Sequence, residues 1–139
     1  MAGGGVSGDL VLDSTAVLQR AADHLDRYGM VYFLYTSPLG ATRLAEQSMC
    51  PVGAIRHSSG LHPDPDHPGA DEDPQRLILA ETAVRRLAAC APVPMRRDPV
   101  KAVLAWVDRR LPSRAEVVSY LRQAAADPSP PGPVPIVPV

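Results

Sequence analysis

Cys50 stands directly before a proline in the segment Ser48–His57, and His57 follows it seven residues later. Pro51 suits the first position of a helix, which makes Cys50 the residue that caps that helix. Unpaired backbone N–H groups and the helix dipole at such a position favour a thiolate, the form of cysteine that acts as a nucleophile. A small buried side chain at a tightly packed helix start fits the same pattern. The sequence leaves both interpretations open.

Two helical turns separate Cys50 from His57, so the two side chains share one face about 10 Å apart along the axis. That distance is too long for the direct thiol–imidazole pair that a cysteine nucleophile needs. A catalytic base must then come from the loop that follows, where His62 and His67 are the candidates. The hypothesis of a small cysteine-dependent enzyme of specialised metabolism therefore names Cys50, His62 and His67 as its catalytic residues.

A second group of residues suits ligand binding. The run Met30–Tyr35 holds three of the six aromatic residues, and an aromatic wall beside Cys50 would suit a small apolar ligand. Trp106 falls beside the main apolar stripe of its predicted helix, where it either flanks the core or lines a groove. Alternatively, the aromatic side chains only close the helical bundle. The candidate ligand-binding residues are Tyr32, Tyr35, His57, Trp106 and Asp108.

The segment 60–73 is polar and rich in proline, which is typical of a mobile loop that could act as a lid. Its donors His62, Asp64, Asp66 and His67 match no zinc signature, and the prolines spread these side chains apart. We therefore expect a solvated acidic loop and no metal site. The chain also contains no phosphate-binding loop, dinucleotide fingerprint or catalytic serine motif, so no cofactor is predicted.

The apolar spacing predicts a mainly α-helical fold, a small bundle of four main helices plus one short helix, with one short extended aromatic segment. The aromatic segment Met30–Tyr35 alone resembles a strand. No second strand is evident, so an extended segment buried between helices is equally expected. A short helical stretch is expected at 41–47. Capping residues and prolines predict the main helices at about 14–28, 74–90, 99–110 and 113–126, and the short helix after Cys50.

A chain of 139 residues is expected to form one compact domain. We expect a flexible arm at 1–12, a single helical domain at 13–126 and an extended proline-rich tail at 127–139. The net charge of −1, with arginines mixed among acids, argues against a nucleic-acid partner. No apolar run approaches the roughly 18 residues of a membrane span, and we expect no secretory signal. Two cysteines without a disulfide framework favour a cytoplasmic protein.

Three short motifs stand out along the chain: the helix ending at Gly29, Cys50-Pro51-Val52-Gly53-Ala54-Ile55, and Trp106-Val107-Asp108 with Ser113-Arg114-Ala115-Glu116-Val117-Val118. Together they resemble a family of small actinobacterial proteins catalogued only as a domain of unknown function. The resemblance covers roughly residues 15–125. It implies a shared fold and supplies no activity to carry over. Where the family has an aromatic residue after the first helix and an asparagine between Trp and Asp, this chain has Met30 and Val107.

The absence of a catalytic constellation favours an accessory domain that binds a protein partner or a small ligand. Its groove is expected near Cys50, the run Tyr32–Tyr35 and Trp106. The proline-rich tail, which suits a docking strand, supports the same function. The cysteine-dependent enzyme is the alternative, and a homodimeric scaffold is the third hypothesis.

Overall fold

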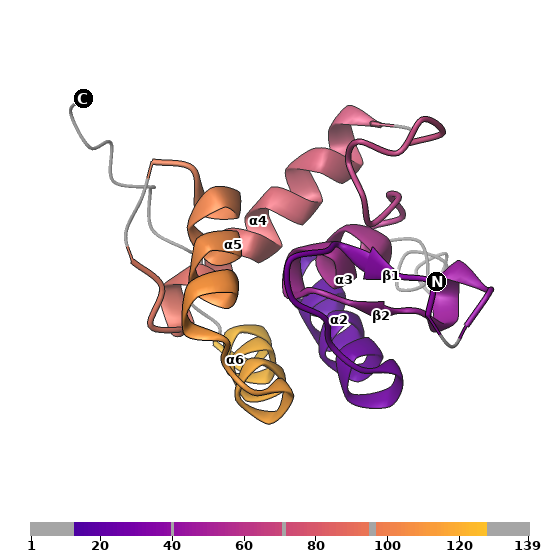
Figure 1. Cartoon of the computed structure of the whole chain (residues 1–139). Helices are drawn as coiled ribbons and strands as arrows, with labels where there is room; N and C mark the ends of the chain where they lie inside the picture. The colour runs from indigo at the N-terminus through magenta and orange to yellow at the C-terminus, as the bar shows by residue number, and fades with distance from the viewer. Residues whose placement is uncertain (1–12, 40, 71, 95–96, 128–139) are drawn as a thin grey trace, which may run out of the picture.

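The computed structural model describes residues 13–39, 41–70, 72–94 and 97–127. The expected arm at 1–12 and all but the first residue of the expected tail lie outside them. The described residues form five α-helices and one small antiparallel sheet (Figure 1), so the predicted mainly helical fold is confirmed. The helices are α2 (Ser14–Tyr28), α3 (Pro51–Ser58), α4 (Pro74–Cys90), α5 (Pro99–Arg110) and α6 (Arg114–Ala126), and the strands are β1 (Thr36–Ser37) and β2 (Ser48–Met49).

The four longer helices begin at the capping residues that the sequence predicts. Side chains that accept hydrogen bonds from the first turn satisfy N–H groups that have no partner within the helix. At the start of α6, Ser113 and Glu116 form a reciprocal capping box, with bonds of 3.1 and 3.2 Å. The other three caps are Asp13, Asp73 and Asp98. Local chemistry therefore sets the helix boundaries.

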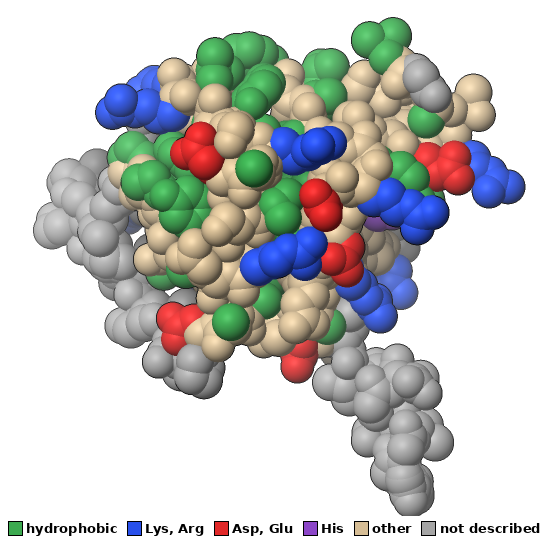
Figure 2. All heavy atoms as spheres, turned by 90° about the horizontal axis from the view of Figure 1, so that it is seen from below, with side chains coloured by type: hydrophobic (Ala, Val, Ile, Leu, Met, Phe, Trp, Pro, Cys, Tyr) green, Lys and Arg blue, Asp and Glu red, His purple; other side chains and the backbone are tan. Residues whose placement is uncertain are grey.

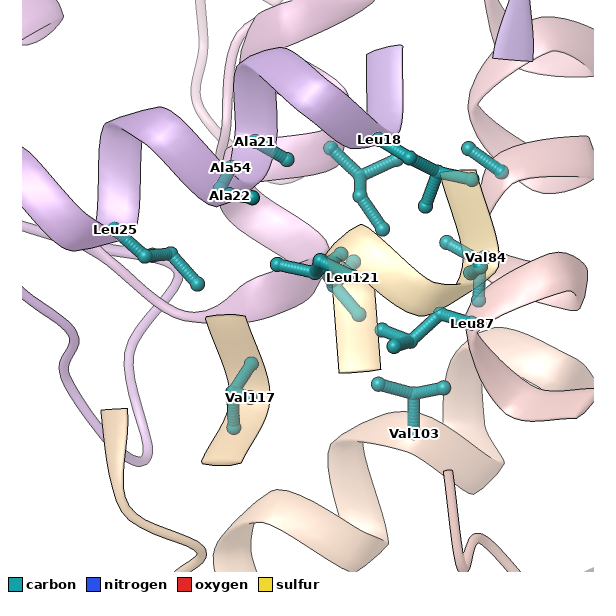
Figure 3. Close-up of a cluster of buried hydrophobic side chains, with 14 of the residues drawn as sticks. Leu18, Ala21, Ala22, Leu25, Ala54, Val84, Leu87, Val103, Val117 and Leu121 are labelled. Carbon is teal, nitrogen blue, oxygen red and sulfur yellow. The ribbon is translucent and has the colours of Figure 1, made fainter. Parts of the chain in front are cut away.

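Helix α2 lies at the centre of the bundle and packs against α3, α4 and α6. Figure 3 shows Leu121 of α6 pointing into a cluster that includes Leu18 of α2 and Leu87 of α4. All three leucines are fully buried, and burying such a side chain stabilises the fold by about 1.5–3 kcal/mol. Aliphatic side chains form most of this core.

The two short strands were not predicted. Thr36 pairs with Met49 and Ser37 with Ser48, and Met30 adds an isolated parallel bridge to Met49. Strands of two residues are too short for an alternating pattern to reveal them. The helical stretch expected at 41–47 is only a single 3-10 turn, Leu44–Glu46.

The aromatic run is not buried between helices, which corrects that expectation. Residues 32–35 form bends rather than a strand. The side chains of Phe33 and Leu34 are 69% and 55% exposed, whereas Tyr32 and Tyr35 are half-buried. The backbone turns outward here because it is attached to the end of α5, as described below.

Figure 2, seen from below, shows charged side chains of both signs scattered among apolar and other atoms. Arg122 of α6 contacts Asp23 at 3.0 Å and Asp26 at 3.7 Å, both on α2. Exposed pairs of this kind contribute little stability, about 0–1 kcal/mol each. Among the described residues, no helix combines the length and the apolar character needed to cross a membrane.

Candidate functional site

Cys50 is the N-cap of α3, as predicted, and Pro51 is the first residue of the helix. The Sγ atom accepts a hydrogen bond from the N–H of Gly53 at 3.3 Å. The side chain is only 2% exposed. Burial raises the pKa of Cys50 to about 11, and the backbone N–H groups of Gly53 and Val52 oppose this only in part. The position at a helix N-terminus therefore does not produce a thiolate, because the loss of hydration dominates.

Gly53 lets the aromatic segment approach the start of α3. The carbonyl oxygen of Tyr35 accepts a hydrogen bond from the N–H of Cys50 at 3.2 Å. A β-carbon on Gly53 would collide with that same carbonyl oxygen. The spacing of Cys50 and Gly53 thus has a structural explanation, since one residue caps the helix and the other makes room for a neighbouring backbone.

His62 and His67 lie against each other rather than against Cys50. Their rings stack with centroids 4.0 Å apart. The Nδ1 atom of His62 accepts a hydrogen bond from the N–H of Asp64 at 3.0 Å, and Nδ1 of His67 accepts one from Gly69 at 3.0 Å. In the part of the chain that the structure describes, these histidine hydrogen bonds stay within the loop.

Two arginines contact the ends of the loop at 60–73. Arg56, which is 8% exposed, donates to the carbonyl oxygen of His62 at 2.9 Å and to Glu72 at 2.7 Å. Arg76 donates to the carbonyl oxygen of Gly60 at 3.0 Å. These contacts attach both ends of the loop to α3 and α4. Among the described residues, no three His, Cys, Asp or Glu side chains are arranged to hold a metal ion.

The predicted ligand-binding residues do not meet in one groove. Trp106 is 3% exposed, and its ring packs edge-on against Tyr120 with centroids 5.9 Å apart, so it belongs to the core. Tyr35 is half-buried, and burial, followed by the charges of Cys50 and Asp66, raises its pKa. Tyr32 and Asp108 help to fix residues 32–35, which we call the aromatic loop, to the end of α5. His57 lies at a different site.

The aromatic loop is fixed over the C-terminal end of α5. The N–H of Phe33 donates to Asp108 Oδ1 at 3.0 Å, and the hydroxyl of Tyr32 donates to the carbonyl oxygen of Pro112. Phe33 has a φ of 66°, in the left-handed region. That conformation costs about 1–2 kcal/mol for a residue with a β-carbon. The tertiary contacts therefore hold a bulky residue in a backbone conformation that it would otherwise avoid.

Three large apolar side chains are exposed on and beside this loop. Phe33 and Leu34 are 69% and 55% exposed, and Leu111, which follows the end of α5, is 51% exposed. Leu111 also has a positive φ of 49° and caps α5. We call Phe33, Leu34 and Leu111 the Phe33 patch. The sequence placed the run Tyr32–Tyr35 in the expected groove, but it predicted neither the exposure of Phe33 and Leu34 nor the part of Leu111, because a continuous apolar run normally indicates a buried segment.

A second site surrounds two histidines, of which the sequence singled out only His57 as a candidate ligand-binding residue. His24 of α2 is buried, and its ring lies edge-on to that of His57 with centroids 5.4 Å apart. The Nε2 atom of His24 lies 2.7 Å from the carbonyl oxygen of Gln47. Burial, and then the charges of His24 and His62, lower the pKa of His57.

Both histidines line a surface hollow with a volume of about 360 Å³, which we call the histidine hollow. Five of its residues come from a single face of α2, because they follow the i, i+3, i+4, i+7, i+8 spacing that brings helical side chains together. That spacing is the sequence signal that could have revealed the site. The lining residues are Arg20, Asp23, His24, Arg27, Tyr28, His57 and Ser58.

Comparison with known protein families finds a match over residues 12–127 to a family of unknown function, DUF6197. No curated protein and no solved structure matches the chain. The match covers nearly all of the described structure and supplies no activity for either site.

Proposed function

We propose that this chain, which belongs to the DUF6197 family of unknown function, is an accessory domain that binds a partner protein through the Phe33 patch. The observation that carries the proposal is the conformation of Phe33, whose side chain is 69% exposed while its backbone is held at positive φ. Folding alone does not account for an exposed phenylalanine that also strains the backbone. Such strain is typical of residues positioned for recognition.

The composition of the patch supports a protein as the partner. Aromatic residues are enriched in protein interfaces, and a contiguous exposed apolar surface is typical of interaction sites. Each of the three side chains has more than half of its surface open. This exposure suits a large partner that covers them together better than a small ligand that must be enclosed.

The anchoring of the loop supports binding without rearrangement. Asp108 holds the backbone of Phe33, and Pro112 holds the side chain of Tyr32. Because these contacts already order the loop, a partner would lose less free energy in immobilising it. The exposed Phe33 ring would then insert into a pocket of the partner.

The cysteine-dependent enzyme is the weaker alternative. Cys50 is 2% exposed, and burial raises its pKa to about 11, whereas a nucleophile requires an accessible thiolate. The two candidate bases, His62 and His67, stack on each other. We also propose a cytoplasmic location, which suits the free thiols of Cys50 and Cys90.

Site-specific photocrosslinking tests the proposed interface. A photoreactive phenylalanine analogue is placed at position 33 of the full chain, expressed in the cells that naturally make the protein. The matched control carries the analogue at Ile78, an apolar residue of α4 that is 68% exposed. We expect a discrete crosslinked species from position 33 and none from position 78. Equal crosslinking at both positions, or none at position 33, would contradict the proposal.

The crosslinked partner is then purified and its affinity is measured directly. The variant Phe33→Gly removes the ring, and glycine adopts the positive φ of this position without strain. A loss of affinity in this variant therefore reports the loss of the ring and not a loss of folding. We expect Phe33→Gly to weaken binding at least about tenfold, because truncation of a central interface residue costs about 2 kcal/mol or more. Unchanged affinity would refute the assignment of the patch. A crosslinked species of twice the chain's own mass would identify a second copy as the partner.

A further inference from the structure

We propose that the histidine hollow binds the phosphoryl group of a small phosphomonoester. The site is separate from the Phe33 patch, because it is built by α2 and the last turn of α3. It would give the domain a second, small-molecule ligand. Three features of the hollow support this proposal: the charges that line it, the paired histidines and its volume.

Two arginines, Arg20 and Arg27, bring positive charge to the hollow. In the described part of the chain, neither Arg20 nor Arg27 forms an ion pair with a carboxylate. The one acidic residue of the lining, Asp23, is instead contacted by Arg122 at 3.0 Å. The guanidinium groups of arginine are well suited to phosphoryl oxygens, because they offer planar, paired donors.

His57 adds a donor that responds to an anion. A carbonyl oxygen only accepts hydrogen bonds, so His24 donates from Nε2 to the carbonyl oxygen of Gln47. The ring of His57 lies 5.4 Å from that of His24, and two positive rings at this distance oppose each other. An anion in the hollow would offset that repulsion and favour protonation of His57.

The size of the hollow favours an organic ester over a bare ion. Its volume of about 360 Å³ lies within the range of small-molecule sites. The ring of Tyr28 packs at 4.9 Å from that of His24, and Arg27 lies over the same tyrosine at 5.3 Å. The ring of Tyr28 would contact the organic part of the ligand while Arg20, Arg27 and His57 hold its phosphoryl group.

The proposed binding depends on pH through the histidines. The charged and titratable groups that face the pair are Arg20, Asp23, Arg27 and Tyr28 of α2, Arg122 of α6 through Asp23, and His62 of the loop. Of these residue types, only histidine ordinarily changes charge between pH 5 and 8. An anion that raises the pKa of His57 by about one unit would bind about tenfold more tightly at low pH than at high pH.

Titration of the full chain with sulfate tests the coupling, because sulfate remains a dianion between pH 5 and pH 8. The His57 imidazole signal is followed by NMR at several pH values, with and without sulfate. We expect saturating sulfate to raise the pKa of His57 by about one unit, and sulfate affinity to rise steadily as the pH falls from 8 to 5, toward the limit of about tenfold that a one-unit shift sets. An unchanged pKa of His57, or an affinity independent of pH, would overturn the proposal.

Variants of exposed arginines locate the binding site. The double variant Arg20→Gln, Arg27→Gln should lose at least about tenfold in sulfate affinity, because it removes both charge-assisted contacts. The control Arg43→Gln changes an arginine outside the hollow whose side chain is 80% exposed, and it should bind like the parent chain. Thermal melts establish that both variants fold. Equal affinity of the double variant and the control would refute the site.

A last comparison identifies the ligand class. Phenyl phosphate and inorganic phosphate are titrated at pH 8, where both are mainly dianions. We expect phenyl phosphate to bind more tightly, by at least about threefold, because its ring can contact the aromatic side chains of the hollow. Equal or weaker binding of phenyl phosphate would contradict the assignment to a phosphomonoester.

Discussion

The carboxylate of Asp108 accepts a hydrogen bond from the backbone N–H of Phe33 at 3.0 Å, although the two residues are 75 positions apart in the sequence. This contact fastens the exposed aromatic loop to the last turn of α5. The loop therefore presents Phe33 in a fixed position, and the conformation of the proposed interface depends on a residue outside it.

Replacing Asp108 tests this dependence. Asp108→Ala removes the acceptor and should cost about 1 kcal/mol of unfolding free energy, measured by chemical denaturation. Hydrogen exchange at the Phe33 N–H should become faster. Asp108→Asn retains an oxygen acceptor and should preserve most of the protection. Equal protection in the alanine variant and the parent chain would show that the bond does not hold the loop.

Two substitutions of Phe33 separate backbone strain from side-chain packing. Glycine adopts a positive φ without steric cost, whereas alanine at this position remains strained. Since the ring is 69% exposed, its removal should cost little packing. We expect Phe33→Gly to be more stable than Phe33→Ala by about 1 kcal/mol, measured as the difference in unfolding free energy. The reverse order would mean that position 33 is not strained.

Gly53 should not tolerate a side chain. Gly53→Ala would force the Tyr35 carbonyl away from α3, and a backbone atom cannot move as cheaply as a flexible side chain. We expect a loss of about 3 kcal/mol or more in unfolding free energy. Gly69→Ala is the matched control, because its new β-carbon would lie at an ordinary contact distance of 3.4 Å from His67. Similar stability of the two variants would refute the packing argument.

Thiol alkylation distinguishes a buried cap from a nucleophile. With a pKa of about 11, Cys50 is almost entirely protonated at pH 8, so its reaction with iodoacetamide should be about a hundredfold slower than that of a model thiol. Cys90 is half-exposed and should react first. The modified residue is identified by mass spectrometry. Alkylation of native Cys50 at or above the rate of a model thiol would support the enzyme instead.

The histidine pair should make stability depend on pH. Burial lowers the pKa of His57 in the folded state below its ordinary value of about 6.5, so the unfolded chain binds the proton more readily. The free energy of unfolding is therefore not reduced by His57 above pH 6.5, and it decreases as the pH falls from 6.5 through the lowered pKa of His57. Thermal melts between pH 7.5 and 5 should show a smaller decline in His57→Gln than in the parent chain. An identical decline would mean that His57 is not responsible.

The positions of the main helices and the residues at which they begin could be predicted from the sequence alone. The bounds of α2, α4 and α5 match the expected ranges, and α6 starts within one residue of its expected position. Cys50 caps α3 as predicted. These features are predictable because capping, proline geometry and helical periodicity act between residues a few positions apart.

The chemical properties of the candidate sites, by contrast, depend on the tertiary structure. Burial, which depends on how α3 packs against α2 and α4, raises the pKa of Cys50 where the local helix start favoured a thiolate. The exposure of Phe33 depends on Asp108, and the histidine hollow depends on α2 meeting the end of α3. Contacts between segments that are distant in the sequence set the hydration and exposure of these side chains. A local sequence pattern cannot predict such contacts.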